Sequence, residues 1–207
     1  ESHLRDEKFT GKVNIMRSNG GVMSVRLAQE QPVSMMESGP VAGIIGAGRL
    51  AALMGIERCI GFDMGGTTAK ASLITKGIPA IEDGYVIGGE ASGQPMQIPV
   101  VDIVEIGAGG GSIAWCDPTG GIHVGPKSAG ADPGPAAYGK GSTDPVVTDA
   151  NLVLGRINAG RFLNGAMKLD VKASERAIEL KLCGPTRLGV KEVALGIVQI
   201  ADAAMSL

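Results

Sequence analysis

An acid, two glycines and two threonines stand together in the run DMGGTT that begins at Asp63. Because glycine has no Cβ, the backbone N–H groups of Gly65 and Gly66 can turn toward an anion and approach it closely. Thr67 and Thr68 add hydroxyl donors, and Asp63 could hold a hydrated Mg²⁺, which takes one or two carboxylates together with water and phosphate oxygens. The run therefore predicts a phosphate-binding hairpin. The alternative is an ordinary hairpin with a diglycine turn.

Apolar residues on both sides of this turn predict the two strands that hold it, within residues 60–74. The chain then passes through Lys76-Gly77 into a third predicted strand, Ile78–Glu82. Three strands joined by short turns form an antiparallel meander, which excludes a simple Rossmann beginning.

The segment before the hairpin predicts a helix that begins at Ser38-Gly39-Pro40, runs to about Met54 and stops at Gly55. Its many glycines disfavour a helix by propensity, so we expect it to pack closely against another backbone or to contact a ligand directly. The apolar residues expected to face inward are Val41, Ile44, Ile45 and Leu53.

A second glycine cluster, Gly109-Gly110-Gly111-Ser112, follows a predicted strand at Val100–Glu105 and precedes an apolar run at Ile113–Cys116. With Gly107 it is a near miss to G-x-G-x-x-G, but a β-like run follows where the dinucleotide fingerprint needs a helix. No G-x-x-x-x-G-K-[ST] run occurs either. Rossmann-type NAD binding and a Walker P-loop are therefore both rejected.

The stretch Gly125–Gly139 contains too many prolines and glycines for a helix or a central strand. A loop of this length is usually functional or disordered, and its alanines, tyrosine and scarce charges favour an ordered loop that lines a site. Lys127 and Asp132 are candidate substrate-facing charges, with plain surface positions as the alternative. His123 stands alone on a predicted strand, which is more typical of a structural residue.

The run Thr148-Asp149-Ala150-Asn151 predicts the opening of a short helix, Leu152–Ile157, with Thr148 or Asp149 as its N-cap. Asp149 is therefore either a helix cap or a site residue.

Two later helices are predicted to be structural. Asp170 caps Val171–Leu182, which Gly184-Pro185 ends, and Gly189 leads into a last helix with one apolar face.

Composition limits the class of protein. A chain of 207 residues with 44% apolar residues can form a core, and its net charge of -2 gives no field for nucleic acid or an anionic membrane. Three scattered cysteines favour reduced thiols in a cytoplasmic protein over a disulfide framework or a zinc site. There is no run of 18 apolar residues and no signal peptide, so we expect no membrane association. The chain starts at Glu1 and stops at Leu207 inside a helical pattern, so we expect a fragment.

Two consecutive motifs resemble those of the actin, heat-shock-chaperone and hexokinase ATPase superfamily, namely its connect helix and its second phosphate motif. They are Pro40-Val41-Ala42-Gly43 and Phe62–Thr67. From about Val13 to Leu207 the chain resembles, more specifically, the hydantoinase A/oxoprolinase family. The motifs that carry this resemblance are Ser38-Gly39-Pro40, the Asp63 hairpin, Ile106–Ala114, Gly125–Gly139 and Val147–Arg156.

The resemblance implies an α/β fold of the ribonuclease H-like (actin-like ATPase) type, present as a partial domain with a mixed sheet and flanking helices. Residues 1–207 would form one central ATPase-like domain. Within it, 38–82 would be the connect helix and phosphate hairpin, 83–147 a glycine-rich insertion with substrate loops, and 148–207 a helical portion. The family's first phosphate motif would lie before residue 1, and its adenosine-binding motif after Leu207.

Members of this family open cyclic amides such as hydantoins or 5-oxoproline with ATP and Mg²⁺, so the resemblance implies an ATP-dependent amidohydrolase. It makes Asp63 the metal-binding or water-positioning acid and, with Thr67, the catalytic pair. The groups that would hold phosphate are Gly65, Gly66, Thr67, Thr68 and Lys70. The residues that would line the adjoining substrate site are Gly109, Gly110, Gly111, Ser112, Lys127, Asp132, Asp149 and Asn151.

The implied partners are a cyclic amide substrate, a second, B-type subunit and further copies in a homo-oligomer. The alternatives are a subunit of an ATP-dependent ketone carboxylase and a non-enzymatic nucleotide switch. Two positions depart from the family. Lys70 stands where many members have an acid, so it would either pair with phosphate or be a solvated strand residue. Ala137 stands where members often have a cysteine, so no thiol chemistry is assigned.

Overall fold

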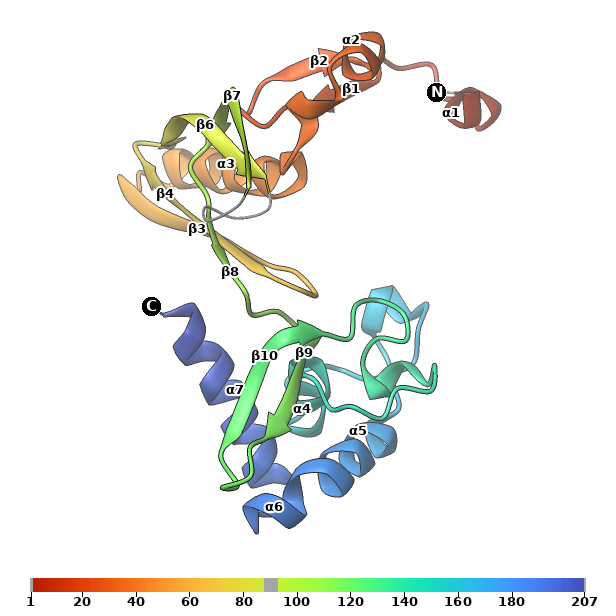
Figure 1. Cartoon of the computed structure of the whole chain (residues 1–207). Helices are drawn as coiled ribbons and strands as arrows, with labels where there is room; N and C mark the ends of the chain where they lie inside the picture. Colours follow the sequence, from red (N-terminus) through yellow and green to blue (C-terminus); the bar gives the residue numbers. More distant parts are fainter. Residues whose placement is uncertain (1, 88–92, 207) are drawn as a thin grey trace. The chain divides into compact units, whose positions relative to one another are not determined.

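The computed structural model describes residues 2–87 and 93–206. These residues form a mixed α/β structure of several antiparallel sheets and helices (Figure 1). The chain divides into two compact units, the first made of residues 1–63 and 71–104 and the second of residues 64–70 and 105–207.

The first unit begins with short elements. They are α1 (Ser2–Asp6), the antiparallel strands β1 (Asn14–Met16) and β2 (Val22–Ser24), α2 (Val25–Glu30) and the 3-10 helix η1 (Pro32–Met35). Ser24 begins α2 as an N-cap, because its Oγ accepts the N–H of Leu27 at 3.3 Å.

Helix α3 (Ser38–Leu53) has the bounds that the sequence predicts, and Gly55 follows it with a left-handed φ of +71°. Val41 and Ile44 of α3 are buried and pack with Ile74 and Val101. These four residues form a hydrophobic core cluster of the unit. Leu53 was expected to face inward and is 82% exposed, so that expectation is wrong.

Among the glycines of α3, Gly48 is required by close packing. A Cβ on Gly48 would lie 2.6 Å from the carbonyl oxygen of Gly77, so the helix can meet the strand turn only without a side chain there. Of the two explanations offered for this helix, close packing against a neighbouring backbone therefore holds at Gly48.

The sheet that α3 packs on contains β3 (Arg58–Met64), β4 (Ala69–Thr75) and β5 (Ile78–Pro79) in that order, and β8 (Val104–Ile106) also pairs with β4. The predicted third strand Ile78–Glu82 is wrong as one strand, because the chain leaves this sheet after β5. It continues as β6 (Ile81–Ile87), which pairs antiparallel with β7 (Gln94–Val101) in a separate sheet.

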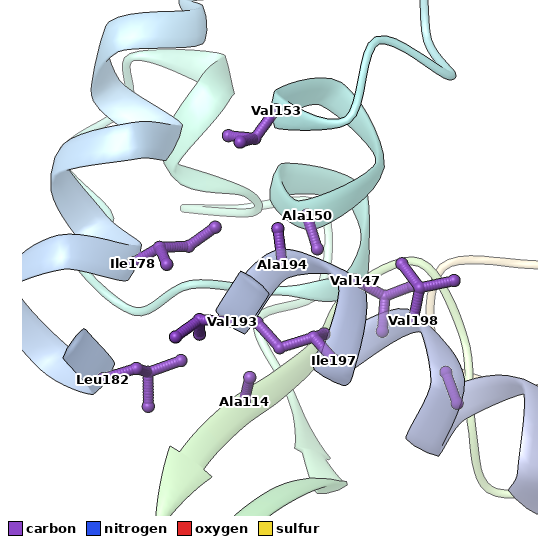
Figure 2. Packing of buried hydrophobic residues seen from close by; sticks show 11 residues of the cluster. Ala114, Val147, Ala150, Val153, Ile178, Leu182, Val193, Ala194, Ile197 and Val198 are labelled. Carbon is purple, nitrogen blue, oxygen red and sulfur yellow. The ribbon is translucent and has the colours of Figure 1, made fainter. Parts of the chain in front are cut away.

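The second unit contains the antiparallel hairpin β9 (Ser112–Cys116) and β10 (Ile122–Ser128), followed by helices. The helices are η2 (Ala136–Tyr138), α4 (Val147–Val153), η3 (Phe162–Gly165), α5 (Val171–Ile178), η4 (Glu179–Cys183), α6 (Gly184–Thr186) and α7 (Val190–Met205). Figure 2 shows their core, in which aliphatic side chains of α4, α5, η4 and α7 meet Ala114 of β9. Val193, Ile197 and Ala201 of the predicted apolar face of α7 are buried there.

Cys59, Cys116 and Cys183 are free thiols. Burial raises the pKa of the Cys116 and Cys183 thiols, which makes them poorer nucleophiles at neutral pH. Across residues 2–87 and 93–206, no helix combines the length and apolar character needed to cross a membrane.

Candidate phosphate-binding site

The turn between β3 and β4 is tight and open to solvent. The N–H of Gly65 donates to the carbonyl oxygen of Thr68 at 2.9 Å, which closes the turn. Gly65, Gly66 and Thr67 are all exposed, and a Cβ added to Gly66 would meet nothing within 4 Å. The backbone of this turn is therefore open to an anion, but the N–H of Gly65, which was predicted to face phosphate, bonds to Thr68 instead.

A second turn, Gly109–Gly111, supports the first from behind. Gly110 and Gly111 donate their N–H groups to the carbonyl oxygens of Gly65 and Gly66, at 3.0 and 2.5 Å. A Cβ on Gly109 would lie 2.7 Å from the carbonyl carbon of Thr67, and one on Gly111 would lie 2.9 Å from the oxygen of Gly66. The glycines of this second turn therefore let two backbones touch, and two of their N–H groups hold the exposed turn.

Two hydroxyls fix the second turn in place. Ser112 is buried, and its Oγ accepts the N–H of Gly109 at 2.9 Å. Thr148 donates both its N–H and its hydroxyl to the carbonyl oxygen of Gly110, each at 2.8 Å. Ser112, a predicted substrate-site residue, is thus buried and stabilises the second turn.

Ser128 is one of two residues at this site that sequence reasoning missed, the other being Glu105, the partner of Lys70. The Oγ of Ser128 lies 3.5 Å from Oγ1 of Thr67 and accepts the N–H of Gly130 at 3.1 Å. The available signal was that Ser128 is the one serine or threonine in the glycine- and proline-rich stretch Gly125–Gly139.

Lys70 takes part in an ion pair. Its Nζ lies 2.9 Å from Oε1 of Glu105 and donates to Oγ1 of Thr68 at 3.1 Å, with the lysine side chain 12% exposed. The hydrogen bond from Lys70 lowers the pKa of the Glu105 carboxyl below its ordinary value, against an opposing effect of burial. Lys70 is therefore not a solvated strand residue, and its charge lies beside Thr68.

Asp149 is fully buried and accepts four hydrogen bonds. Its donors are the N–H groups of Val146 at 3.1 Å, Ala136 at 3.1 Å and Ala137 at 2.9 Å, and the hydroxyl of Ser174 at 2.6 Å. The carboxylate thus caps α4 and also holds the loop that carries Ala136 and Ala137. It is a positioning group in this structure.

The predicted boundaries around Asp149 need correction. Helix α4 begins at Val147 and not near Leu152, so Asp149 lies inside its first turn, with Val146 as the N-cap. The expectation that all of Gly125–Gly139 is loop is also wrong, because β10 extends to Ser128 through a register shift after Val124. Four residues of that stretch therefore belong to the hairpin.

Three predicted substrate residues make none of the described hydrogen bonds to the turn between β3 and β4. Asn151 donates its side-chain amide to the carbonyl oxygen of Val147 in its own helix, at 3.1 Å. Asp132 and Lys127 are exposed. Lys127 lines a cavity of about 610 Å³ whose wall includes Trp115 and Leu182.

Residues 1–206 match the family model described as Hydantoinase/oxoprolinase. This chain belongs to the hydantoinase/oxoprolinase family. The uncharacterized protein MJ0964 of Methanocaldococcus jannaschii is 43% identical to it over 98% of this chain and 31% of its own length. The caprolactamase subunit alpha of Pseudomonas jessenii is 36% identical over 91% of this chain and 27% of its own. The chain thus spans less than a third of the length of these relatives.

Two solved structures of the family resemble the chain along almost its whole length. The nucleotide-free structure of acetone carboxylase has a TM-score of 0.81 at 32% identity and covers 98% of this chain and 28% of its own. The ATP-dependent caprolactamase from Pseudomonas jessenii has a TM-score of 0.73 at 32% identity and covers 99% of this chain and 29% of its own.

Both solved structures are described as ATP-dependent, and the residues at the turn between β3 and β4 fit phosphate. Exposed glycine backbone, exposed Thr67 and a hydroxyl at Ser128 are the donors that phosphate oxygens accept from. In the described part of the chain no three acidic, histidine or cysteine side chains gather as a metal site. Asp63, the carboxylate that the sequence proposes for Mg²⁺, is exposed at the end of β3.

Proposed function

We propose that this chain forms the phosphate-binding part of an ATP-dependent amidohydrolase that opens a cyclic amide of the hydantoin or 5-oxoproline type. The observation that carries the proposal is the exposed turn Gly65–Thr68, whose backbone is held from behind by Gly109–Gly111. A turn so rigidly supported, with its outer face free of side chains, is suited to bind a phosphate group in a fixed orientation.

Transfer of a phosphoryl group from ATP to the amide oxygen, with ADP as the leaving group, would make the amide carbon more electrophilic and that oxygen a better leaving group. The backbone N–H groups of Gly66 and Thr67 and the hydroxyl of Thr67 would then orient the transferring phosphoryl group and balance its charge. Asp63 would hold the cation or a water molecule. Lys70, fixed by Glu105, would add positive charge behind Thr68.

The proposal includes a ribonuclease H-like, actin-type ATPase fold for the part of the chain that carries the hairpin. Its support is the order of elements, in which the glycine-rich helix α3 precedes the hairpin β3–β4 and packs on the same sheet. The relative named as an alpha subunit supports a further proposal, a second, B-type subunit as partner.

A carboxylase subunit is the second candidate, favoured by the TM-score of 0.81 to acetone carboxylase. In that case phosphorylation would activate bicarbonate or a ketone instead of an amide. Both reactions would use the same phosphate turn, so the turn does not distinguish them. Their second substrates do.

The test is ATP hydrolysis by the full-length protein, with and without 5-oxoproline, a hydantoin panel and a lactam, and separately with bicarbonate and a ketone. We expect one cyclic amide to stimulate turnover, and Asp63→Asn to abolish it. Asp202→Asn, which changes an exposed acid of α7, is the matched control and should hydrolyse ATP like wild type. Stimulation that requires bicarbonate would select the carboxylase, and no ATP hydrolysis under any condition would refute both.

A further inference from the structure

We propose that Ser128 is a second hydroxyl donor to the phosphoryl group and that it couples phosphate binding to the loop 129–139. This inference rests on the proposed function and extends it to a residue outside the hairpin. It makes the loop after β10 responsive to the nucleotide.

The distance between the two hydroxyls fits a shared ligand better than a direct bond. Oγ of Ser128 and Oγ1 of Thr67 are 3.5 Å apart, whereas hydroxyl hydrogen bonds are usually about 2.7–2.8 Å long. One phosphate oxygen can lie about 2.7 Å from both atoms at once, because the three atoms then form an open triangle. The pair is therefore spaced to grip a single oxygen from two sides.

The hydrogen-bond inventory leaves the Ser128 proton available for this purpose. A serine hydroxyl has one proton and two lone pairs, and the N–H of Gly130 uses one lone pair at 3.1 Å. The proton can then turn from Thr67 toward an anion without losing the bond to Gly130. Charge on the phosphate would strengthen both bonds to it, since charge-assisted hydrogen bonds are roughly twice as strong as neutral ones.

The position of Ser128 makes it a link between the phosphate turn and the loop. The next residue, Ala129, donates its N–H to Gly111 of the supporting turn at 2.8 Å, and the far end of the loop is held by Asp149 through Ala136 and Ala137. Between these anchors Gly130 is exposed, with a φ of +62° and no neighbour within 4 Å of an added Cβ. A phosphate held by Ser128 would therefore restrain the open part of the loop through Gly130.

The test measures binding and loop order together. Calorimetry with a magnesium complex of a non-hydrolysable ATP analogue gives the affinity, and hydrogen exchange with and without the analogue gives the protection of residues 129–139. Both are measured on the full-length protein, as wild type, Ser128→Ala and Ser128→Thr. The control is Thr119→Ala, which removes a hydroxyl at the other end of the same hairpin, where it bonds to Asp117.

We expect Ser128→Ala to weaken binding about 10- to 100-fold, the loss of one hydrogen bond to a charged group, and to abolish the ligand-induced protection. Ser128→Thr keeps the hydroxyl and should retain both effects, as should Thr119→Ala. Wild-type affinity and protection in a folded Ser128→Ala variant would overturn this inference and leave the proposed function standing. No binding of the analogue by the wild type would overturn both.

Discussion

Two glycine-rich turns lie back to back in the second unit, and they use the missing Cβ for opposite purposes. In Gly65–Thr68, which we call the exposed turn, the absence of side chains leaves backbone open to a ligand. In Gly109–Gly111, which we call the supporting turn, it lets one backbone press against another at distances that no Cβ permits. A high glycine content therefore marks both a binding surface and the structure that makes it rigid, and substitutions can separate the two roles.

The largest effect should come from Asp149→Asn, which alters the group that holds the loop beside the supporting turn. The amide has one acceptor oxygen and would direct an NH₂ group at backbone donors that now bond to a carboxylate. We expect a loss of about 3 kcal/mol or more in the free energy of unfolding, measured with urea. Asp170→Asn, at an exposed N-cap with one bond to Ala173, is the matched control and should cost about 1 kcal/mol or less. Equal losses in the two variants would contradict this role for Asp149.

A smaller but more specific effect is expected at the supporting turn. In Gly109→Ala the new methyl group would lie 2.7 Å from backbone of the exposed turn, so one of the two turns must move. We expect a loss of about 1–3 kcal/mol, the usual cost of overpacking, together with weaker binding of an ATP analogue. Urea unfolding and calorimetry on the same preparation check the two effects. Unchanged stability would show that the turns are not pressed together.

The exposed turn should show the reverse pattern. A Cβ on Gly66 meets nothing within 4 Å, and Gly66 does not have a positive φ, so Gly66→Ala should change stability by less than about 0.5 kcal/mol. The methyl group would stand where the phosphate must approach, so binding of the analogue should fall at least tenfold. Undiminished binding in Gly66→Ala would show that the phosphate does not bind at this turn, and the two turns would then not differ in the way described.

The exposed turn could be predicted from sequence because its chemistry is local. The Gly-Gly pair after Met64 determines a tight turn, and the two threonines that follow place hydroxyls beside it. Helix α3 was equally predictable, since Pro40 and Gly55 mark its two ends. The supporting turn was found as a glycine cluster, but its role was not, because that role depends on contacts with residues more than 40 positions earlier in the chain.

Ser128 and Glu105 were missed for the same reason. Ser128 lies 61 residues from Thr67, and Glu105 lies 35 residues from Lys70, so no local pattern joins either pair. The third strand was mispredicted because Ile78–Glu82 is continuous in hydropathy, while the pairing partner changes from β4 to β7 within it. Strand exchange between sheets is decided by tertiary contacts, which periodicity does not encode.

The smallest effect is expected from the ion pair at the base of the exposed turn. Glu105→Gln removes the charge that Lys70 stabilises, but the glutamate side chain is 49% exposed and solvent screens the pair. We therefore expect a loss of less than about 1 kcal/mol in the free energy of unfolding at pH 7. Glu175→Gln, at an exposed position of α5, is the control and should behave like wild type.

The stability difference between wild type and Glu105→Gln should depend on pH in a definite direction. Because the pKa of Glu105 is lower in the folded state, the unfolded chain binds the proton first as the pH falls below the ordinary value of 4.5. The contribution of the pair is thus complete above that value and is lost as the pH falls through the lowered pKa of the folded state. Urea unfolding at pH 7 and at successively lower pH should show the gap between wild type and Glu105→Gln closing on acidification. A gap that does not close on acidification would show that the charge of Glu105 is not what stabilises the folded state here.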